Sequence, residues 1–410
     1  MAEPVIPVSV SVVRSVPSSA AAVGLAVGPS GPVPRQLGLN RATLEAHGFT
    51  GKVGQTLVVP SSSAPVYVAV GIGDDPSTAQ LRDAAAALSR AVSKRDHVAT
   101  NLATQGSGDP AVTAQAVTEG VLLANYRVQG FKSEDQNGDG RLATLSLVVP
   151  APAGRAAERG AARGAVTARA ASLARDLANT PPNHLTARQI ATRAERLAGE
   201  HGLQVEVFDK DQLAVLGCGG ILGVNAGSHE PPRMVKLTYA PRNAKAHVVL
   251  VGKGVMYDSG GISLKPSNPM HGIMKMDMSG AAAVLATMSA LRDVGCRNKV
   301  TAFLMCTDNM PSGSALKLGD VLRFRNGKTA EIQNTDAEGR LILADGLSLA
   351  VEEQPDAIVD IATLTGAAMA ALGTDMAAVL GTDDALIERV KAASAATDEL
   401  GWQLPLARDR

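Results

Sequence analysis

Asn334-Thr335-Asp336-Ala337-Glu338-Gly339-Arg340-Leu341 is the stretch that says most about the fold of this 410-residue chain. Two carboxylates stand two residues apart, and a glycine and an arginine that we expect to open a helix follow them. On an extended segment, residues i and i+2 point to the same side. Asp336 and Glu338 are therefore predicted to aim at one spot.

A second segment with similar chemistry lies upstream, and it is followed by Asp277. It reads Val251-Gly252-Lys253-Gly254-Val255-Met256-Tyr257-Asp258-Ser259-Gly260-Gly261-Ile262-Ser263-Leu264-Lys265. Hard divalent cations prefer oxygen ligands, and two cations held close together need carboxylates that bridge them. The carboxylates on these glycine-rich turns therefore indicate a divalent-metal site, although oxygen ligands alone leave Zn, Mn, Mg and Co open.

Together these segments resemble the leucyl aminopeptidase family, the cytosolic di-metal aminopeptidases. The octapeptide is similar to the family's signature, and the upstream segment is similar to its first metal-binding stretch. Further similar segments are Ala174 to Thr186, Asn309 to Gly313 and Thr363 to Ala367. The similarity is strong from about residue 170 to the end and thin before it, apart from Glu119 to Lys132.

The resemblance implies two divalent cations per subunit, Mn or Zn. The implied ligands are Lys253, Asp258, Asp277, Asp336 and Glu338. The counterpart of Glu338 bridges both cations, and that of Asp258 also contacts the pair. Asp336 completes one site and Asp277 the other. A lysine ligates only as the neutral amine, which requires proton release driven by the metal. Taken singly, acids on such loops are more often helix caps or turn formers, and a lysine after a strand is more often a surface residue.

By the same resemblance, Lys265 and Arg340 are the catalytic residues. The counterpart of Lys265 faces the substrate carbonyl and stabilises the oxyanion that develops there. The counterpart of Arg340 holds a bicarbonate ion that relays a proton, a task suited to a planar, permanently charged side chain. The alternative for Arg340 is an ordinary surface arginine, but a cation at a helix start is electrostatically unfavourable.

Four further residues match positions that line the substrate side-chain pocket in the family. They are Met274, Thr363, Leu364 and Gly366. An apolar pocket of this kind accepts Leu- or Met-like residues and discriminates weakly between them. The alternative is that these are plain core residues.

The pattern of strands and helices predicts an α/β chain with two domains. Residues 1–160 form a small N-terminal α/β domain, 161–183 a connecting helix, and 184–410 a catalytic domain whose mostly parallel central sheet is covered by helices. Residues 14–35, rich in Pro, Ser, Gly and Ala, are predicted to be a surface loop. The segment from Ala151 to Gly164 begins with a Pro/Gly break and continues Ala/Arg-rich, and the domain boundary is expected there. Lys253 and Asp258 are expected just past a strand that ends at Val251.

Composition excludes several other classes. Lys+Arg and Asp+Glu are equal at 39 each, which gives no global argument for a nucleic-acid or membrane partner. The three scattered cysteines form no CxxC, so a reducing cytoplasm is expected. No signal peptide or membrane span is expected.

One further motif has a separate interpretation. Asp135 to Gly140 imitates the start of an EF-hand calcium loop but lacks that loop's final acid, so it is predicted to be a hairpin turn.

The sequence therefore predicts a metal-dependent aminopeptidase that hydrolyses N-terminal residues from peptides with a water activated by two metals. The alternative is a catalytically weak or inactive relative that acts as an oligomeric scaffold or a DNA-binding protein. The resemblance also implies a cytoplasmic homo-hexamer, a dimer of trimers. Because the chain stops at Arg410, we expect the catalytic domain to be incomplete at its C-terminal end.

Overall fold

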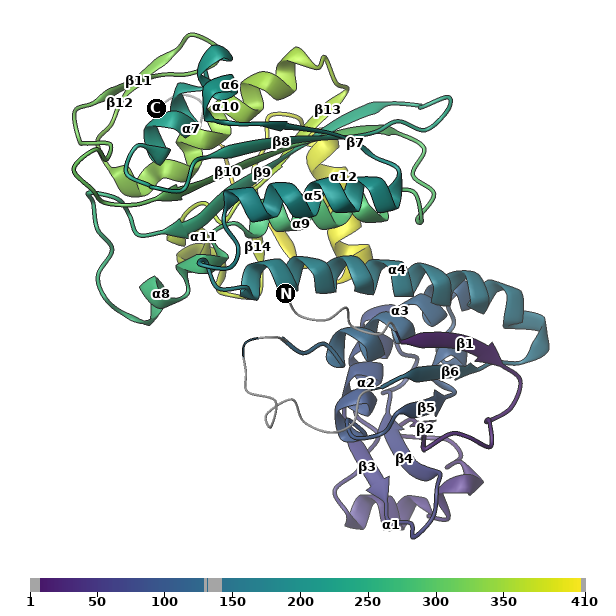
Figure 1. Cartoon of the computed structure of the whole chain (residues 1–410). Coiled ribbons are helices and arrows are strands. Elements are labelled where there is room, and N and C mark those ends of the chain that lie inside the picture. The colour runs from purple at the N-terminus through teal and green to yellow at the C-terminus, as the bar shows by residue number, and fades with distance from the viewer. Residues whose placement is uncertain (1–7, 129–130, 132–141, 407–410) are drawn as a thin grey trace. The chain divides into compact units, whose positions relative to one another are not determined.

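The computed structural model describes residues 8–128, 131 and 142–406. The hairpin turn predicted at Asp135 to Gly140 lies outside these residues. Contacts divide the chain into two units, Met1–Ser172 and Leu173–Arg410. The chain passes from one to the other inside a long helix, α4 (Gly154–Asn179). Each unit is an α/β structure, as predicted (Figure 1).

The first unit is built on a six-stranded sheet with the order β1-β6-β5-β2-β4-β3. Every pairing is parallel except that between β3 and β4. The strands are β1 Ser9–Val13, β2 Ala22–Val27, β3 Thr56–Val59, β4 Val66–Gly71, β5 His97–Thr100 and β6 Thr144–Val148. The helices are η1 Arg35–Leu37, α1 Arg41–Ala46, α2 Thr78–Ala91, η2 Leu102–Thr104, α3 Pro110–Ala124 and η4 Ala151–Ala153.

Strand β2 contradicts the surface loop predicted for residues 14–35. All six of its residues are buried, because β4 and β5 flank it and both faces of the sheet are covered. Its alternate residues enter two different cores, Ala22 and Ala26 on one face, and Val23 and Leu25 on the other. A strand buried on both faces reads as a continuous apolar run, and small residues in a Gly- and Pro-rich context conceal that run.

The second unit is built on a five-stranded sheet with the order β13-β9-β10-β8-β7. Strand β8 runs against its two neighbours, and the other four strands share one direction. The mostly parallel sheet is therefore confirmed. Its strands are β7 Gln204–Phe208, β8 Arg233–Tyr239, β9 His247–Asp258, β10 Lys299–Asn309 and β13 Ala357–Ile361. Two small pairs accompany it, β11 Val321–Arg323 with β12 Thr329–Glu331, and β14 Ala377–Val379 with β15 Gly401–Gln403.

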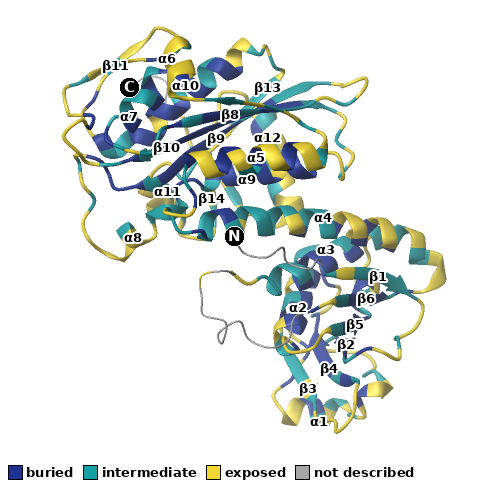
Figure 2. Cartoon of the chain, in the orientation of Figure 1, coloured by how far each residue is buried: buried dark blue, intermediate teal, exposed yellow. Residues whose placement is uncertain are grey.

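Helices cover both faces of this sheet (Figure 1). One core packs α5 and α9 against it, and the other packs α6, α7 and α10, so buried residues line the sheet on either side (Figure 2). The helices are α5 Ala187–His201, α6 Lys210–Val215, α7 Gly219–Asn225, α8 Pro269–Gly272, η5 Met274–Met276, α9 Ser279–Ala290, η6 Thr335–Ala337, α10 Glu338–Glu352, α11 Gly366–Leu372 and α12 Asp384–Thr397.

Helix α4 begins at Gly154, directly after the Pro/Gly break predicted at the start of the Ala151 to Gly164 segment, and it runs through the Ala/Arg-rich part without interruption. Two glycines inside this helix allow close packing against α3. A Cβ at Gly160 would lie 1.9 Å from the carbonyl oxygen of Ala111, and one at Gly164 would lie 2.7 Å from that of Gln115. The two helix backbones can approach this closely only where no side chain stands between them.

Candidate metal centre

The centre lies where parallel strands of the second unit end. Strand β9 ends at Asp258 and pairs there with Asn309, the last residue of β10. The sequence predicted a strand ending at Val251, with Lys253 and Asp258 beyond it. The strand instead continues to Asp258 because β10 runs beside it for the whole length. The carboxyl ends of such strands are where crevices form in open α/β sheets.

Asp336 and Glu338 reach the centre from a helical turn and not from an extended segment. Asp336 lies in η6, and Glu338 is the first residue of α10. The side chain of Asn334 accepts a hydrogen bond from the Asp336 backbone N–H at 2.9 Å, and this cap starts the turn. The premise of the sequence argument was therefore wrong, although the two carboxylates do converge.

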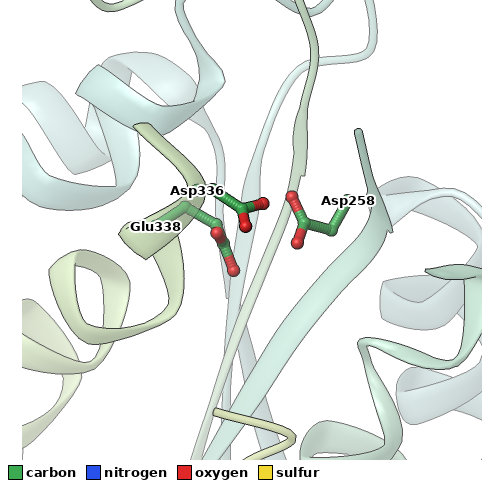
Figure 3. Close-up of side chains that lie close together, drawn as sticks. All are labelled: Asp258, Asp336 and Glu338. Carbon is green, nitrogen blue, oxygen red and sulfur yellow. The ribbon is translucent and has the colours of Figure 1, made fainter. Parts of the chain in front are cut away.

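Three carboxylates form the core of the centre. Asp258, Asp336 and Glu338 each offer an oxygen, and these oxygens all lie within 4.8 Å of one another. Figure 3 shows their side chains pointing toward one another, Asp258 from the end of β9, Asp336 from η6 and Glu338 from the start of α10. The turn after β9 requires Gly260, whose φ is +88° and whose Cβ would lie 3.0 Å from Oδ1 of Asp336. Such a cluster of oxygen donors is one that divalent cations favour.

Lys253 forms a second group that shares Glu338 with the first. Its Nζ lies 2.8 Å from Asp277 Oδ2, 2.8 Å from Glu338 Oε1 and 2.8 Å from the carbonyl oxygen of Thr363. Its side chain is 2% exposed. Burial lowers the pKa of Lys253, but the two carboxylates outweigh burial and leave the pKa above its ordinary value.

Lys265 pairs with the two carboxylates that Lys253 does not contact. Its Nζ is 2.8 Å from Asp258 Oδ2 and 2.6 Å from Asp336 Oδ1. Partial burial lowers the pKa of Lys265, but the two ion pairs raise it well above its ordinary value. Its side chain remains one-fifth exposed, so it stays accessible to a molecule that enters the centre.

Asp277 follows η5 and is buried. Burial raises the pKa of Asp277 to about 7, against the opposing effect of the Lys253 ammonium. Its Oδ1 accepts a hydrogen bond from the hydroxyl of Thr363 at 2.7 Å. Thr363 was predicted to line a substrate pocket, and the structure shows that it contacts both Asp277 and Lys253.

Two buried carboxylate oxygens provide a test of whether a cation fits here. Within the described ranges, Asp277 Oδ2 and Asp336 Oδ1 have no hydrogen-bond partner other than a lysine ammonium, at 2.8 and 2.6 Å respectively. Buried polar atoms in folded proteins are nearly always satisfied. Oxygens with this unfilled capacity, beside two other carboxylates, fit the ligand requirements of a divalent cation.

The remaining predicted residues lie around the centre. Arg340 stands in the first turn of α10 with an exposed side chain, and within the described part of the chain that side chain makes no hydrogen bond or ion pair. Met274 is half-buried in η5. Leu364 is 44% exposed, and Gly366, the first residue of α11, is also exposed. The exposure of Leu364 and Gly366 contradicts the alternative that these two are core residues.

The sequence argument missed three residues that support the ligands. Asn309 donates to Asp258, Thr335 donates its hydroxyl hydrogen bond to the carbonyl oxygen of Gly260, and Gly339 lies against Lys253. Asn309, Thr335 and Gly339 all lie inside segments that the resemblance had singled out, so the sequence did point to these positions. Their contacts depend on chain segments far apart in sequence and could not be deduced locally.

Comparison with known proteins then decides the family. Residues 172–410 match the cytosol aminopeptidase family catalytic domain, and residues 38–135 match the N-terminal domain of the same family. A probable cytosol aminopeptidase of Streptomyces avermitilis is 44% identical over 381 residues, covering 89% of this chain and 73% of that protein. One from Leifsonia xyli is 46% identical over 369 residues, covering 89% and 72%.

The chain belongs to the cytosol aminopeptidase family. Solved structures agree with this assignment. The bottromycin maturation enzyme BotP in complex with Mn has a TM-score of 0.86 at 39% identity, covering 95% of this chain and 82% of that one. A tomato leucine aminopeptidase mutant has a TM-score of 0.89 at 28% identity, covering 99% and 84%.

Family membership confirms the coarser predictions made from the sequence. The chain is a leucyl aminopeptidase-type hydrolase, a metal-dependent peptidase whose substrates are peptides. The alternative of an inactive scaffold or DNA-binding relative is not favoured by these matches. No helix in the described ranges has the length and apolar character needed to cross a membrane.

Proposed function

We propose that this chain removes N-terminal residues from peptides with two divalent cations held at the carboxylate centre. One observation carries the proposal: Glu338 belongs to both groups of ligands. It lies in the carboxylate triad and also 2.8 Å from Lys253. A carboxylate shared between two donor groups is what a pair of close cations requires.

The ligands divide into two overlapping sets. Asp258, Asp336 and Glu338 would hold one cation, and Lys253, Asp277 and Glu338 the other. Because a lysine ligates only as the neutral amine, binding at the second position would be coupled to proton release from Lys253. Mn and Zn both suit these donors, and the Mn in the BotP structure supports Mn for this chain. When bound, such cations polarise a carbonyl and lower the pKa of water.

Two charged side chains supply the rest of the chemistry. Lys265 keeps its proton, because its pKa is raised, and its accessible ammonium would stabilise negative charge developing on the substrate carbonyl oxygen. Arg340 has a guanidinium without a partner in the described ranges. It would hold a small planar anion such as bicarbonate by paired hydrogen bonds.

Met274, Thr363, Leu364 and Gly366 would line the pocket for the first side chain of the peptide. The exposure of Leu364 and the partial exposure of Met274 support an apolar surface that a Leu- or Met-like residue contacts. The contacts of Thr363 with Asp277 and Lys253 support a position for this pocket beside the proposed second cation.

We also propose a cytoplasmic location and a homo-hexamer built as a dimer of trimers.

The test is turnover of leucine p-nitroanilide by protein stripped of metal and then titrated with Mn²⁺ or Zn²⁺. We expect activity to appear only with metal and to saturate at two cations per chain. Leucine and methionine p-nitroanilides should be turned over similarly, and the aspartate analogue poorly. Saturation at one cation per chain, or full activity in the stripped protein, would refute the two-metal proposal.

A further inference from the structure

Asn309 is a buried amide that lies between segments of the centre. It is 4% exposed. Its Nδ2 lies 2.9 Å from Asp258 Oδ1, 3.0 Å from the carbonyl oxygen of Thr335 and 3.5 Å from Glu338 Oε2. All three neighbours are acceptors when the carboxylates are ionised, so the amide nitrogen and not its oxygen must face them.

The first consequence concerns the orientation of Asp258. Its Oδ1 accepts one hydrogen bond from Asn309 Nδ2 and a second from the backbone N–H of Gly260, each at 2.9 Å. These donors come from different strands and turns, so they hold one oxygen of the carboxylate in place. The other oxygen, Oδ2, is left to face the centre, where it contacts Lys265.

The second consequence concerns the segment that carries Asp336 and Glu338. The other N–H of Asn309 goes to the carbonyl oxygen of Thr335, the residue just before Asp336. The hydroxyl of Thr335 in turn donates to the carbonyl oxygen of Gly260 at 2.7 Å and accepts from the backbone N–H of Ser263 at 2.8 Å. The end of β9 and the start of α10 are therefore tied together through Asn309 and Thr335.

We infer that Asn309 is a positioning residue that holds the Asp258 carboxylate and, through the carbonyl oxygen of Thr335, the segment that carries Asp336 and Glu338 together before a cation arrives. Like charges this close repel one another, and fixed N–H donors offset that repulsion. A set of ligands that is already converged binds a cation more tightly, and loss of a residue that supports ligands typically lowers metal affinity about 10–100-fold. The inference rests on the metal centre of the proposed function.

Asn309→Leu tests this idea because leucine keeps the branching and the number of side-chain heavy atoms of asparagine but has no N–H donor. Asn309→Ala serves as a second variant if the leucine variant does not fold. The chain offers a matched control in Asn225, another fully buried asparagine. Its Nδ2 donates to the carbonyl oxygen of Glu230 at 2.9 Å and lies 3.1 Å from the hydroxyl of Thr307, and neither is a ligand.

The measurements are calorimetric titration of each metal-free protein with Mn²⁺ and its free energy of unfolding in urea. We expect Asn309→Leu to weaken Mn²⁺ binding about 10–100-fold. Asn225→Leu should lower the free energy of unfolding by a similar amount but bind Mn²⁺ as tightly as the unsubstituted chain. A purely structural role for Asn309 would instead give the two variants the same affinity.

Three outcomes overturn the inference. Equal Mn²⁺ affinities for Asn309→Leu and the unsubstituted chain, or an equal loss in Asn225→Leu, would overturn it while leaving the proposed function intact. Failure of the unsubstituted protein to bind Mn²⁺ would overturn the proposed function and the inference together.

Discussion

The ammonium of Lys253 and the carboxylate of Glu338 lie 2.8 Å apart, and their side chains are 2% and 3% exposed. An unpaired buried charge is costly, so these two groups stabilise one another in the folded chain. Lys253 has a second partner in Asp277 at the same distance, whereas Glu338 also belongs to the triad with Asp258 and Asp336. Glu338 is therefore the side chain on which both donor groups depend.

Removing this shared carboxylate should abolish binding at both positions. We expect Glu338→Ala to lose turnover and most of its bound metal, because two cations would be left with too little compensating charge. Asp336→Ala should lose turnover but keep the cation held by Lys253 and Asp277. Metal analysis of the purified variants, with exposed Glu331→Ala in β12 as control, measures this. Near-normal metal content and turnover in both variants would contradict the assignment.

The clustering of Asp258, Asp336 and Glu338 was predictable from the sequence, but the local geometry that brings them together was not. Asp336 and Glu338 were expected on an extended segment, and they lie in η6 and α10. The turn is held by Thr335, whose hydroxyl binds the carbonyl oxygen of Gly260 on a distant segment. Propensities within the octapeptide carry no information about that partner.

An error in the first unit has a related cause. Proline, serine and glycine around β2 predicted a loop, yet Ala22–Val27 is a strand buried by neighbours that come later in the chain. Gly160 and Gly164 lie inside α4, where they allow it to contact α3. A glycine required by close packing and a glycine that ends a helix look the same in one sequence.

Lys265 should affect the chemical step more than binding. Lys265→Ala is expected to lose about 2–4 kcal/mol of transition-state stabilisation, the usual scale for one oxyanion donor. The loss should appear in kcat, while both metals remain bound, because the carboxylates that hold them are unchanged. Steady-state kinetics with metal analysis tests this, and exposed Lys317→Ala is the control. An effect confined to KM would show that Lys265 binds substrate and transition state equally.

Asp308, next to Asn309 in β10, should make stability depend on pH. Burial raises the pKa of Asp308 to about 6, although the hydroxyl of Ser228 donates to it at 3.0 Å. An aspartate in an unfolded chain has a pKa of about 3.9, so the folded state binds this proton more tightly. The contribution of Asp308 is therefore fully present below pH 4 and is lost as the pH rises through about 6.

Asp308→Asn removes the charge and retains an acceptor for Ser228. We expect its free energy of unfolding to exceed that of the unsubstituted chain by about 1–3 kcal/mol at pH 8 and to match it near pH 4. Urea unfolding at the two pH values measures the difference. A gap of equal size at both values would show that the effect comes from packing rather than from ionisation.

Gly339 lies against the side chain of Lys253, so a substitution there tests whether the position of the lysine amine matters for metal binding. A Cβ at this position would lie 2.8 Å from both Cε and Nζ of Lys253, so one of the two must move. The lysine head cannot move without weakening its contacts with Asp277, Glu338 and Thr363. In Gly339→Ala we therefore expect Mn²⁺ affinity and turnover to fall about tenfold or more, the scale seen when the groups that hold a ligand are disturbed.

Gly199→Ala is the matched control for this substitution. Gly199 lies in helix α5, is exposed, and has no atom within 4 Å of the Cβ that alanine would add. Alanine in a helix is favoured over glycine by about 0.5–1 kcal/mol, so this variant should be slightly more stable and fully active. The measurements are Mn²⁺ titration, leucine p-nitroanilide turnover and urea unfolding of both variants. If Gly339→Ala behaves like Gly199→Ala in all three, the position of the Lys253 amine does not matter to the metal centre, and Lys253 is not a ligand.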